Sequence, residues 1–147
     1  MSDHEDQPQP ETAAPVTFDF ASLDTTATSD KGRKMLLEHP VTGEPLGVGA
    51  FIVLAGADSS AYRKAQSVIS KRRVKKRLDK ITAEDMRAES VEMLARCSLS
   101  WGNIIVDGQE WSCSVETAKA FFTRFPWAYE QADRFVHDRS NYLQDLQ

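Results

Sequence analysis

The hydrophobic and polar positions in the last third of the chain predict a β-hairpin and then a helix. Residues 104–106 (Ile-Ile-Val) form a β-branched run, and the Asp107-Gly108 pair that follows is a strong signal for a tight hairpin turn. Ser114 has a side chain that can cap a helix N-terminus, so a helix is expected from Val115 onward.

A proline divides the helical region that follows. Pro126 has no backbone N–H, so it either ends one helix or begins the next within its first turn. The pattern therefore predicts two helices hinged at Phe125-Pro126-Trp127. Because no catalytic group accompanies these aromatic residues, we expect function to lie on a surface of this region.

An earlier hairpin is predicted in the first half of the chain. Residues 35–38 are typical of a strand, residues 39–45 are rich in turn formers, and residues 46–54 are typical of the returning strand. Gly47 and Gly49 interrupt the returning strand and indicate a bulge or a close backbone approach.

Two more helices are predicted between these regions. Asp58 or Ser59 can cap the first, and Thr82 with Asp85 resembles a capping box at the start of the second. Apolar residues recur at helical spacing along the first helix: Ala61, Tyr62, Ala65, Val68 and Ile69. The second continues to Cys97.

Composition is consistent with one core of modest size, since the chain has 147 residues of which 41% are hydrophobic. We expect an α+β fold: a mainly helical single domain over residues 31–147, with about four helices and one or two short β-hairpins. No apolar run reaches the roughly 20 residues of a transmembrane helix, and no signal peptide is recognised, so a cytosolic protein is expected.

Residues 1–30 are expected to form a mobile acidic tail. They contain Asp and Glu but no Lys or Arg, and prolines at positions 8, 10 and 15. Such a segment buries too little apolar surface to offset the entropy of ordering, so we expect it to be dispensable for folding. Phe18, Phe20 and Leu23 are exceptions, and two interpretations stay open: a short docking motif, or residues that fold back onto the domain.

Basic residues gather in residues 63–80, whose local charge is about +8 in a chain of net charge −4. The candidate basic face is Arg72, Arg73, Lys75 and Lys76. It could bind phosphates, or it could be a solvated helix face that an acidic surface covers. The acidic remainder of the chain, the absence of interleaved aromatics and the absence of a known nucleic-acid module weigh against nucleic acid.

The sequence contains no pattern typical of an enzyme. His4, His39 and His137 stand apart from any nucleophile motif, and Cys97 with Cys113 is too small a set for a closed zinc site. We therefore expect no enzymatic activity, no catalytic residues, no metal and no cofactor.

Several segments, in this order, resemble the tail assembly chaperones of long-tailed (siphovirus-like) bacteriophages and prophages. They are Val41-Thr-Gly-Glu-Pro45, an apolar strand ending at Gly56, Ala61-Tyr-Arg-Lys-Ala65, a basic helix, a segment from Leu94 to Trp101-Gly, Phe125-Pro-Trp127, and Asp138-Arg-Ser-Asn-Tyr-Leu143. The resemblance covers roughly residues 37–143, and its specificity comes from order and spacing. The acidic N-terminal extension is unlike the family core.

This resemblance implies a non-enzymatic chaperone of the host cytoplasm, absent from the mature virion. It would bind the tape measure protein, keep it soluble and promote tail tube polymerisation around it, with the tail tube protein as a second partner and self-association as a third contact. The alternatives are a nucleic-acid-binding accessory protein that uses the basic helix, and a structural tail or connector component. The aromatic residues expected to contact the partner are Phe121, Phe122, Phe125, Trp127, Tyr129, Phe135 and Tyr142.

Overall fold

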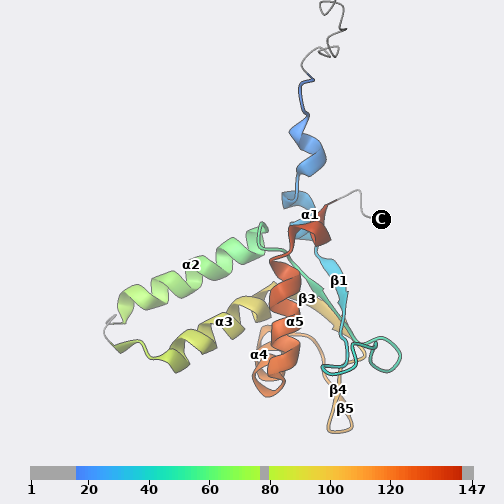
Figure 1. Ribbon diagram of the computed structural model, residues 1–147. Coiled ribbons are helices and arrows are strands. Elements are labelled where there is room, and N and C mark those ends of the chain that lie inside the picture. The colour runs from blue at the N-terminus through green and yellow to red at the C-terminus, as the bar shows by residue number, and fades with distance from the viewer. Residues whose placement is uncertain (1–15, 77–79, 144–147) are drawn as a thin grey trace, which may run out of the picture.

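The centre of the fold is a three-stranded antiparallel sheet in the order β1-β2-β3 (Figure 1). The structure is a computed structural model in which residues 16–76 and 80–143 are described. Strand β2 (Phe51–Leu54) lies between β1 (Arg33–Leu36) and β3 (Ser98–Gly102). The register of β2 against β3 shifts between Val53 and Leu54, which marks a β-bulge.

Helices make up most of the remaining structure. In the described part of the chain they are α1 (Thr26–Lys31), α2 (Ser60–Lys75), α3 (Ala83–Cys97), α4 (Val115–Arg124) and α5 (Pro126–Val136), with the short 3-10 helices η2 (Phe20–Leu23) and η4 (Arg139–Tyr142). A separate hairpin joins β4 (Ile105–Val106) to β5 (Gln109–Glu110). The expected fold class, a mainly helical α+β domain, is confirmed. None of the helices in residues 16–76 and 80–143 is both long and apolar enough to cross a membrane.

Helices α2, α3, α4 and α5 begin at the capping residues and the proline from which the sequence predicts them. Ser59 caps α2 by accepting a hydrogen bond from the Tyr62 N–H, and Thr82 with Asp85 forms the capping box of α3. Ser114 caps α4, where Thr117 supplies the reciprocal bond. Pro126 is the first residue of α5, the position at which its missing N–H has no cost.

The first hairpin differs from the prediction. The returning strand begins at Phe51 instead of residue 46, because residues 46–49 form turns. Gly47 and Gly49 have φ angles of 55° and 97°, a backbone region that favours glycine over other residues. The first strand ends at Leu36, and an isolated bridge between Glu38 and Pro45 continues the pairing.

The core lies where the sheet meets the last three α-helices. Ile52 and Leu54 of β2 are fully buried, and they belong to one apolar cluster with Leu94 of α3, Phe122 of α4 and Val136 of α5. Figure 1 shows α4 and α5 beside the sheet, while α2 and α3 lie side by side and extend away from it. The C-terminal end of α3 leads directly into β3.

The N-terminal boundary of the folded domain lies before residue 31. Ser29 in α1 is buried, and its carbonyl accepts a hydrogen bond from the Gly56 N–H. A Cβ at Gly56 would lie 2.5 Å from the Ser29 hydroxyl oxygen, so the missing side chain of Gly56 permits this close approach. The Thr25 hydroxyl also donates to Asp58. Residues 25–30 therefore belong to the domain, contrary to the predicted tail of residues 1–30.

The rest of the predicted tail divides into two parts. Residues 1–15 lie outside the described residues. Phe18, Phe20 and Leu23 are exposed, so they do not fold back onto the domain as one interpretation held.

We expect two truncations to separate tail from domain. A chain that begins at Asp24 keeps the contacts of α1 and should unfold at the same urea midpoint as the full chain. A chain that begins at Lys31 loses three hydrogen bonds, made by Thr25, the Ser29 carbonyl and Asp30, and should lose about 2–4 kcal/mol of stability. Equal midpoints for the two truncations would contradict the placement of α1.

Candidate partner-binding groove

Helices α4 and α5 meet at a single residue, Phe125. It ends α4 by donating its N–H to the Phe121 carbonyl, and its own carbonyl accepts from the N–H groups of Ala128 and Tyr129 in α5. The predicted hinge at Phe125-Pro126-Trp127 is therefore present, and it holds the two helices at a fixed angle without an intervening loop.

Aromatic rings continue from the core through this hinge to the surface. The Phe121 ring lies 5.5 Å from that of Trp101 and 5.1 Å from that of Phe125, and the Phe125 ring lies 6.1 Å from that of Trp127. Such edge-to-face and tilted pairs have a favourable geometry for aromatic packing. The half-buried end of the series, Phe125 and Trp127, is positioned by the buried end.

An apolar groove opens beside the hinge. Its volume is about 450 Å³, within the range of binding pockets in proteins. The loop that precedes β2 contributes Leu46 and Val48, and the β4 segment contributes Ile105. The other lining residues are Leu37, Gly47, Ala50, Asn103, Ile104, Val106, Phe121, Phe125 and Trp127. None of the described residues that line it is acidic or basic, so an apolar ligand surface is the chemical match.

A charged pair lies next to this groove. Arg124 donates two hydrogen bonds to the Asp107 carboxylate, at 2.7 and 3.0 Å, and lowers the pKa of that carboxyl group. Asp107 and Gly108 both have positive φ angles, 54° and 80°, as a two-residue hairpin turn requires. The turn thus places Asp107 within reach of α4 and ties the β4–β5 hairpin to the hinge.

The structure corrects three of the seven predicted contact residues. Phe121, Phe122 and Tyr142 are buried, so their rings belong to the core, although Phe121 also lines the groove. Helical spacing gave the aromatic face of each helix but could not show that this face packs against the sheet.

The other four predicted residues are partly exposed, but they do not form one surface. Phe125 and Trp127 line the groove. Phe135 lines a separate depression beside β1, and Tyr129 packs partly on the core beside Phe122. The aromatic site is therefore smaller than predicted.

Sequence reasoning missed the aliphatic part of the groove. Val48 and Ile105 are exposed, and both line it. The only sign of this surface in the sequence was the pair Gly47 and Gly49. Their positive φ angles turn the loop so that the Val48 side chain is exposed.

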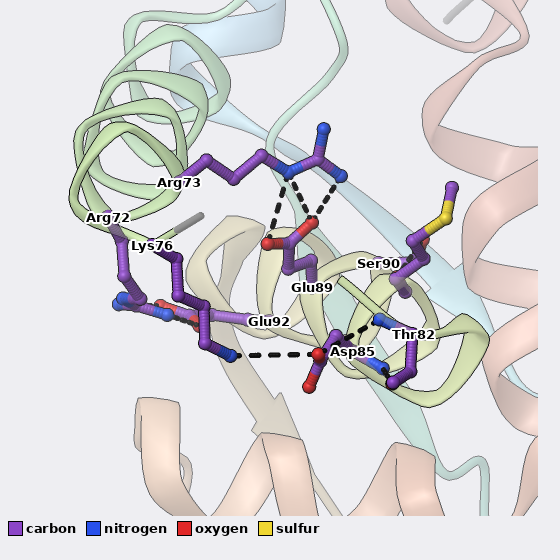
Figure 2. Close-up of polar contacts among 9 residues, drawn as sticks. Arg72, Arg73, Lys76, Thr82, Asp85, Glu89, Ser90 and Glu92 are labelled. Carbon is purple, nitrogen blue, oxygen red and sulfur yellow. Dashed lines mark hydrogen bonds and ion pairs between the residues drawn. The ribbon is translucent and has the colours of Figure 1, made fainter. Parts of the chain in front are cut away.

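The predicted basic face is largely neutralised by acidic residues of α3. Figure 2 shows Arg72 paired with Glu92, Arg73 with Glu89, and Lys76 with Asp85. The carboxylate of Glu92 also accepts a hydrogen bond from Arg96, 2.9 Å away. Of the four predicted residues only Lys75 makes no ion pair within the part of the chain that the structure describes. The acidic surface that the sequence left open as a cover is α3.

The ion pairs between α2 and α3, together with the Glu92–Arg96 pair within α3, form a ladder. Glu92 is its centre, because it pairs with both Arg72 and Arg96. It is buried, with 5% of its surface exposed, and hydrogen bonds from Arg72 and then Arg96 lower the pKa of its carboxyl group to about 2. Because a buried carboxylate without its partners is costly, loss of either guanidinium should destabilise the contact between the helices, whereas loss of an exposed pair costs little.

The surroundings of His39 and Cys97 are those of residues that support the fold. His39 accepts hydrogen bonds from the N–H groups of Val41 and Thr42 in its own turn. Cys97 is buried, and burial raises the pKa of its thiol to about 12. Among the described residues, no group of three or more His, Cys, Asp or Glu side chains is placed to hold a metal ion. His4 lies outside the described residues.

Comparisons of the chain with protein-family models, with curated proteins and with solved structures found no match.

Truncation of two aromatic residues should separate core from groove. Phe122→Ala removes a fully buried ring and should cost about 3–5 kcal/mol of unfolding free energy. Trp127→Ala, at a half-buried position, should cost clearly less. Chemical denaturation of both variants measures the difference, and equal losses would mean that Trp127 is a core residue.

We expect the ion pairs of Glu92 to make the free energy of unfolding depend on pH. The folded-state pKa lies below the ordinary value of 4.5, so the stabilisation is present above 4.5 and disappears as the pH falls towards about 2. Glu92→Gln should therefore lower stability at pH 7 by on the order of 2 kcal/mol. The gap between variant and wild type should shrink as the pH falls. A gap that is unchanged at pH 3 would contradict this role.

Proposed function

We propose that this protein is a non-enzymatic chaperone that holds an apolar face of a helical partner in the groove beside the α4–α5 hinge. The observation that carries the proposal is the groove itself, which combines aromatic Phe125 and Trp127 with exposed aliphatic Val48 and Ile105. Recognition of an amphipathic helix requires such an apolar concave surface, into which the partner inserts side chains spaced three or four residues apart.

The groove is preorganised by its surroundings. The buried ring of Phe121 packs against Phe125 and against Trp101. The Trp101 indole is fixed in turn, because it donates a hydrogen bond to the Trp111 carbonyl, 2.7 Å away. A rigid apolar site loses little conformational entropy when a partner binds. It also exposes only a limited apolar area, which favours a protein that stays soluble before and after it is loaded.

The resemblance to tail assembly chaperones supplies the identity of the partner. On this proposal the partner is the tape measure protein, a long helical chain that needs a soluble companion, and the tail tube protein joins as the tube polymerises around it. The place of action is the host cytoplasm, and the mature virion lacks the chaperone.

The two alternative functions have less support. A nucleic-acid-binding surface needs basic side chains that are available to phosphates, and three of the four predicted ones are paired with α3. A tail tube or connector subunit would be expected to have long strands that extend a continuous sheet. The described strands have five residues at most.

Co-expression with the tape measure protein of the same phage tests the proposal. The wild-type chain should keep that partner in the soluble fraction, and Val48→Glu should abolish most of this effect, because it places a charge in the apolar groove. Val41→Glu is the matched control. It lies in the same loop region and has a similar exposure, 86% against 88% for Val48, but it is not among the residues that line the groove.

Three outcomes are informative. Loss of solubilisation in Val48→Glu but not in Val41→Glu supports the groove as the site. A partner that precipitates equally with and without the wild-type chain contradicts the chaperone function. Tight binding of nonspecific DNA that weakens by roughly 10³-fold between about 50 and 200 mM salt would favour the nucleic-acid alternative instead.

A further inference from the structure

Strand β1 has an open edge. The Leu37 N–H donates to the Ala50 carbonyl, so in this antiparallel ladder the backbone groups of every second residue point towards β2. The N–H and C=O groups of Lys34, Leu36 and Glu38 consequently point away from β2. Among the described residues, no group forms a hydrogen bond with the outward N–H and C=O of Lys34 and Leu36.

The open stretch is limited at both ends by side chains. The amide group of Gln131 in α5 accepts from the Glu38 N–H at 3.0 Å and donates to the Glu38 carbonyl at 2.8 Å, which is the pair of bonds that a neighbouring strand would make. At the other end the Arg33 guanidinium donates to the Leu143 carbonyl, 3.3 Å away. The unoccupied part of the edge is therefore long enough for a strand of only a few residues.

A groove runs beside this edge. Its volume is about 360 Å³, and Met35, Leu36 and Phe135 supply its large apolar surfaces. The charged residues that line it are Lys34, Glu38, Arg134 and Asp138. Two positive and two negative side chains make the site neutral overall, so backbone pairing and apolar packing would dominate its affinity.

The N-terminal segment has the complementary pattern. Val16, Phe18 and Phe20 alternate with Thr17 and Asp19, which is the period of a strand. Phe18 and Phe20 are 56% and 76% exposed, and their rings pack together 5.3 Å apart on one side of the segment. Asp19 has extended backbone angles, φ −92° and ψ 110°. Phe20 is the first residue of η2, so addition as a strand requires it to leave this short 3-10 helix. An apolar and exposed segment of this kind is suited to strand addition.

Residues 16–20 are placed where they can reach a second molecule more easily than the β1 edge of their own chain. Only Asp24 and Thr25 separate η2 from α1, and α1 is anchored through Thr25 to Asp58 and through Ser29 to Gly56. Figure 1 shows η2 and the residues before it pointing away from β1. The segment would have to reverse its direction to reach the edge of its own sheet.

We propose that residues 16–20 of one copy add as a fourth strand to the β1 edge of a second copy. In this pairing Phe18 and Phe20 face the groove with Met35 and Phe135, and Asp19 lies on the opposite face near Lys34, where the charges are complementary. Reciprocal exchange of the two segments closes a twofold dimer. This inference does not rest on the proposed function, because it uses a different surface.

Sedimentation equilibrium of the full chain tests the exchange. The wild type should form a dimer whose fraction rises with protein concentration. The double variant Phe18→Ser/Phe20→Ser should weaken dimerisation at least about tenfold, a change of about 1.4 kcal/mol. Val41→Ser/Val74→Ser is the control, since it removes two exposed apolar side chains elsewhere, 86% and 84% exposed.

A second variant tests the edge. Leu36→Pro removes the outward N–H but no hydrogen bond to β2, and proline is tolerated at such edge positions. It should be monomeric, whereas Leu36→Ser, which keeps the N–H, should still dimerise. Thermal melting shows whether Leu36→Pro is folded.

Mixing gives the decisive result. The segment variant has an intact edge and Leu36→Pro has an intact segment, so a mixed pair keeps one of the two exchanges. An equimolar mixture should therefore associate more strongly than either variant alone and less strongly than the wild type. A monomeric wild type overturns the proposal. It is also overturned if the mixture associates no more than the separate variants, or if folded Leu36→Pro dimerises like the wild type.

Discussion

Burial of the central strand β2 is the constraint on which the rest of the structure depends. Ile52 and Leu54 have no exposed surface, and the strand pairs with a neighbour on each side. The buried Tyr142 hydroxyl donates to the Leu54 carbonyl, 3.1 Å away, and so ties the C-terminal helix η4 to the end of this strand. The loop that leads into β2 forms the groove, and the strand paired with it supplies the open edge. Both surfaces are therefore positioned by one short strand, of which Ile52 and Leu54 are fully buried.

Helix α2 shows a different balance of forces. It buries only Ala65 and Ile69, so apolar packing alone is a weak support for a helix of 16 residues. The ladder on α3 compensates, because Glu92 is buried between two guanidinium groups and its charge is stabilised there. Arg72 and Arg73 of α2 thus act mainly within the molecule. A high local charge in a sequence indicates a nucleic-acid surface only where the structure leaves that charge unpaired.

Local features could be predicted from the sequence, and long-range features could not. The caps at Ser59 and Ser114, the turn at Asp107 and the helix start at Pro126 each depend on a few adjacent residues. Pairing of β2 with β3 joins residues about fifty positions apart, and no local pattern encodes it. The same limit explains the aromatic set: periodicity shows that Phe122 and Trp127 lie on apolar faces, but only the packing shows which of them is buried.

The two apolar surfaces differ in the kind of partner that they can bind. The groove at Phe125 and Trp127 is lined by apolar side chains and selects side chains, whereas the β1 edge offers backbone groups and accepts an extended segment. Gln131 separates them. It lies one helical turn after Trp127 and closes the end of the β1 edge at Glu38. Because the hydrogen bonds between Gln131 and Glu38 end the open edge there, a strand added beside Lys34 and Leu36 would leave the groove open. The proposed self-association is therefore compatible with binding of a helical partner.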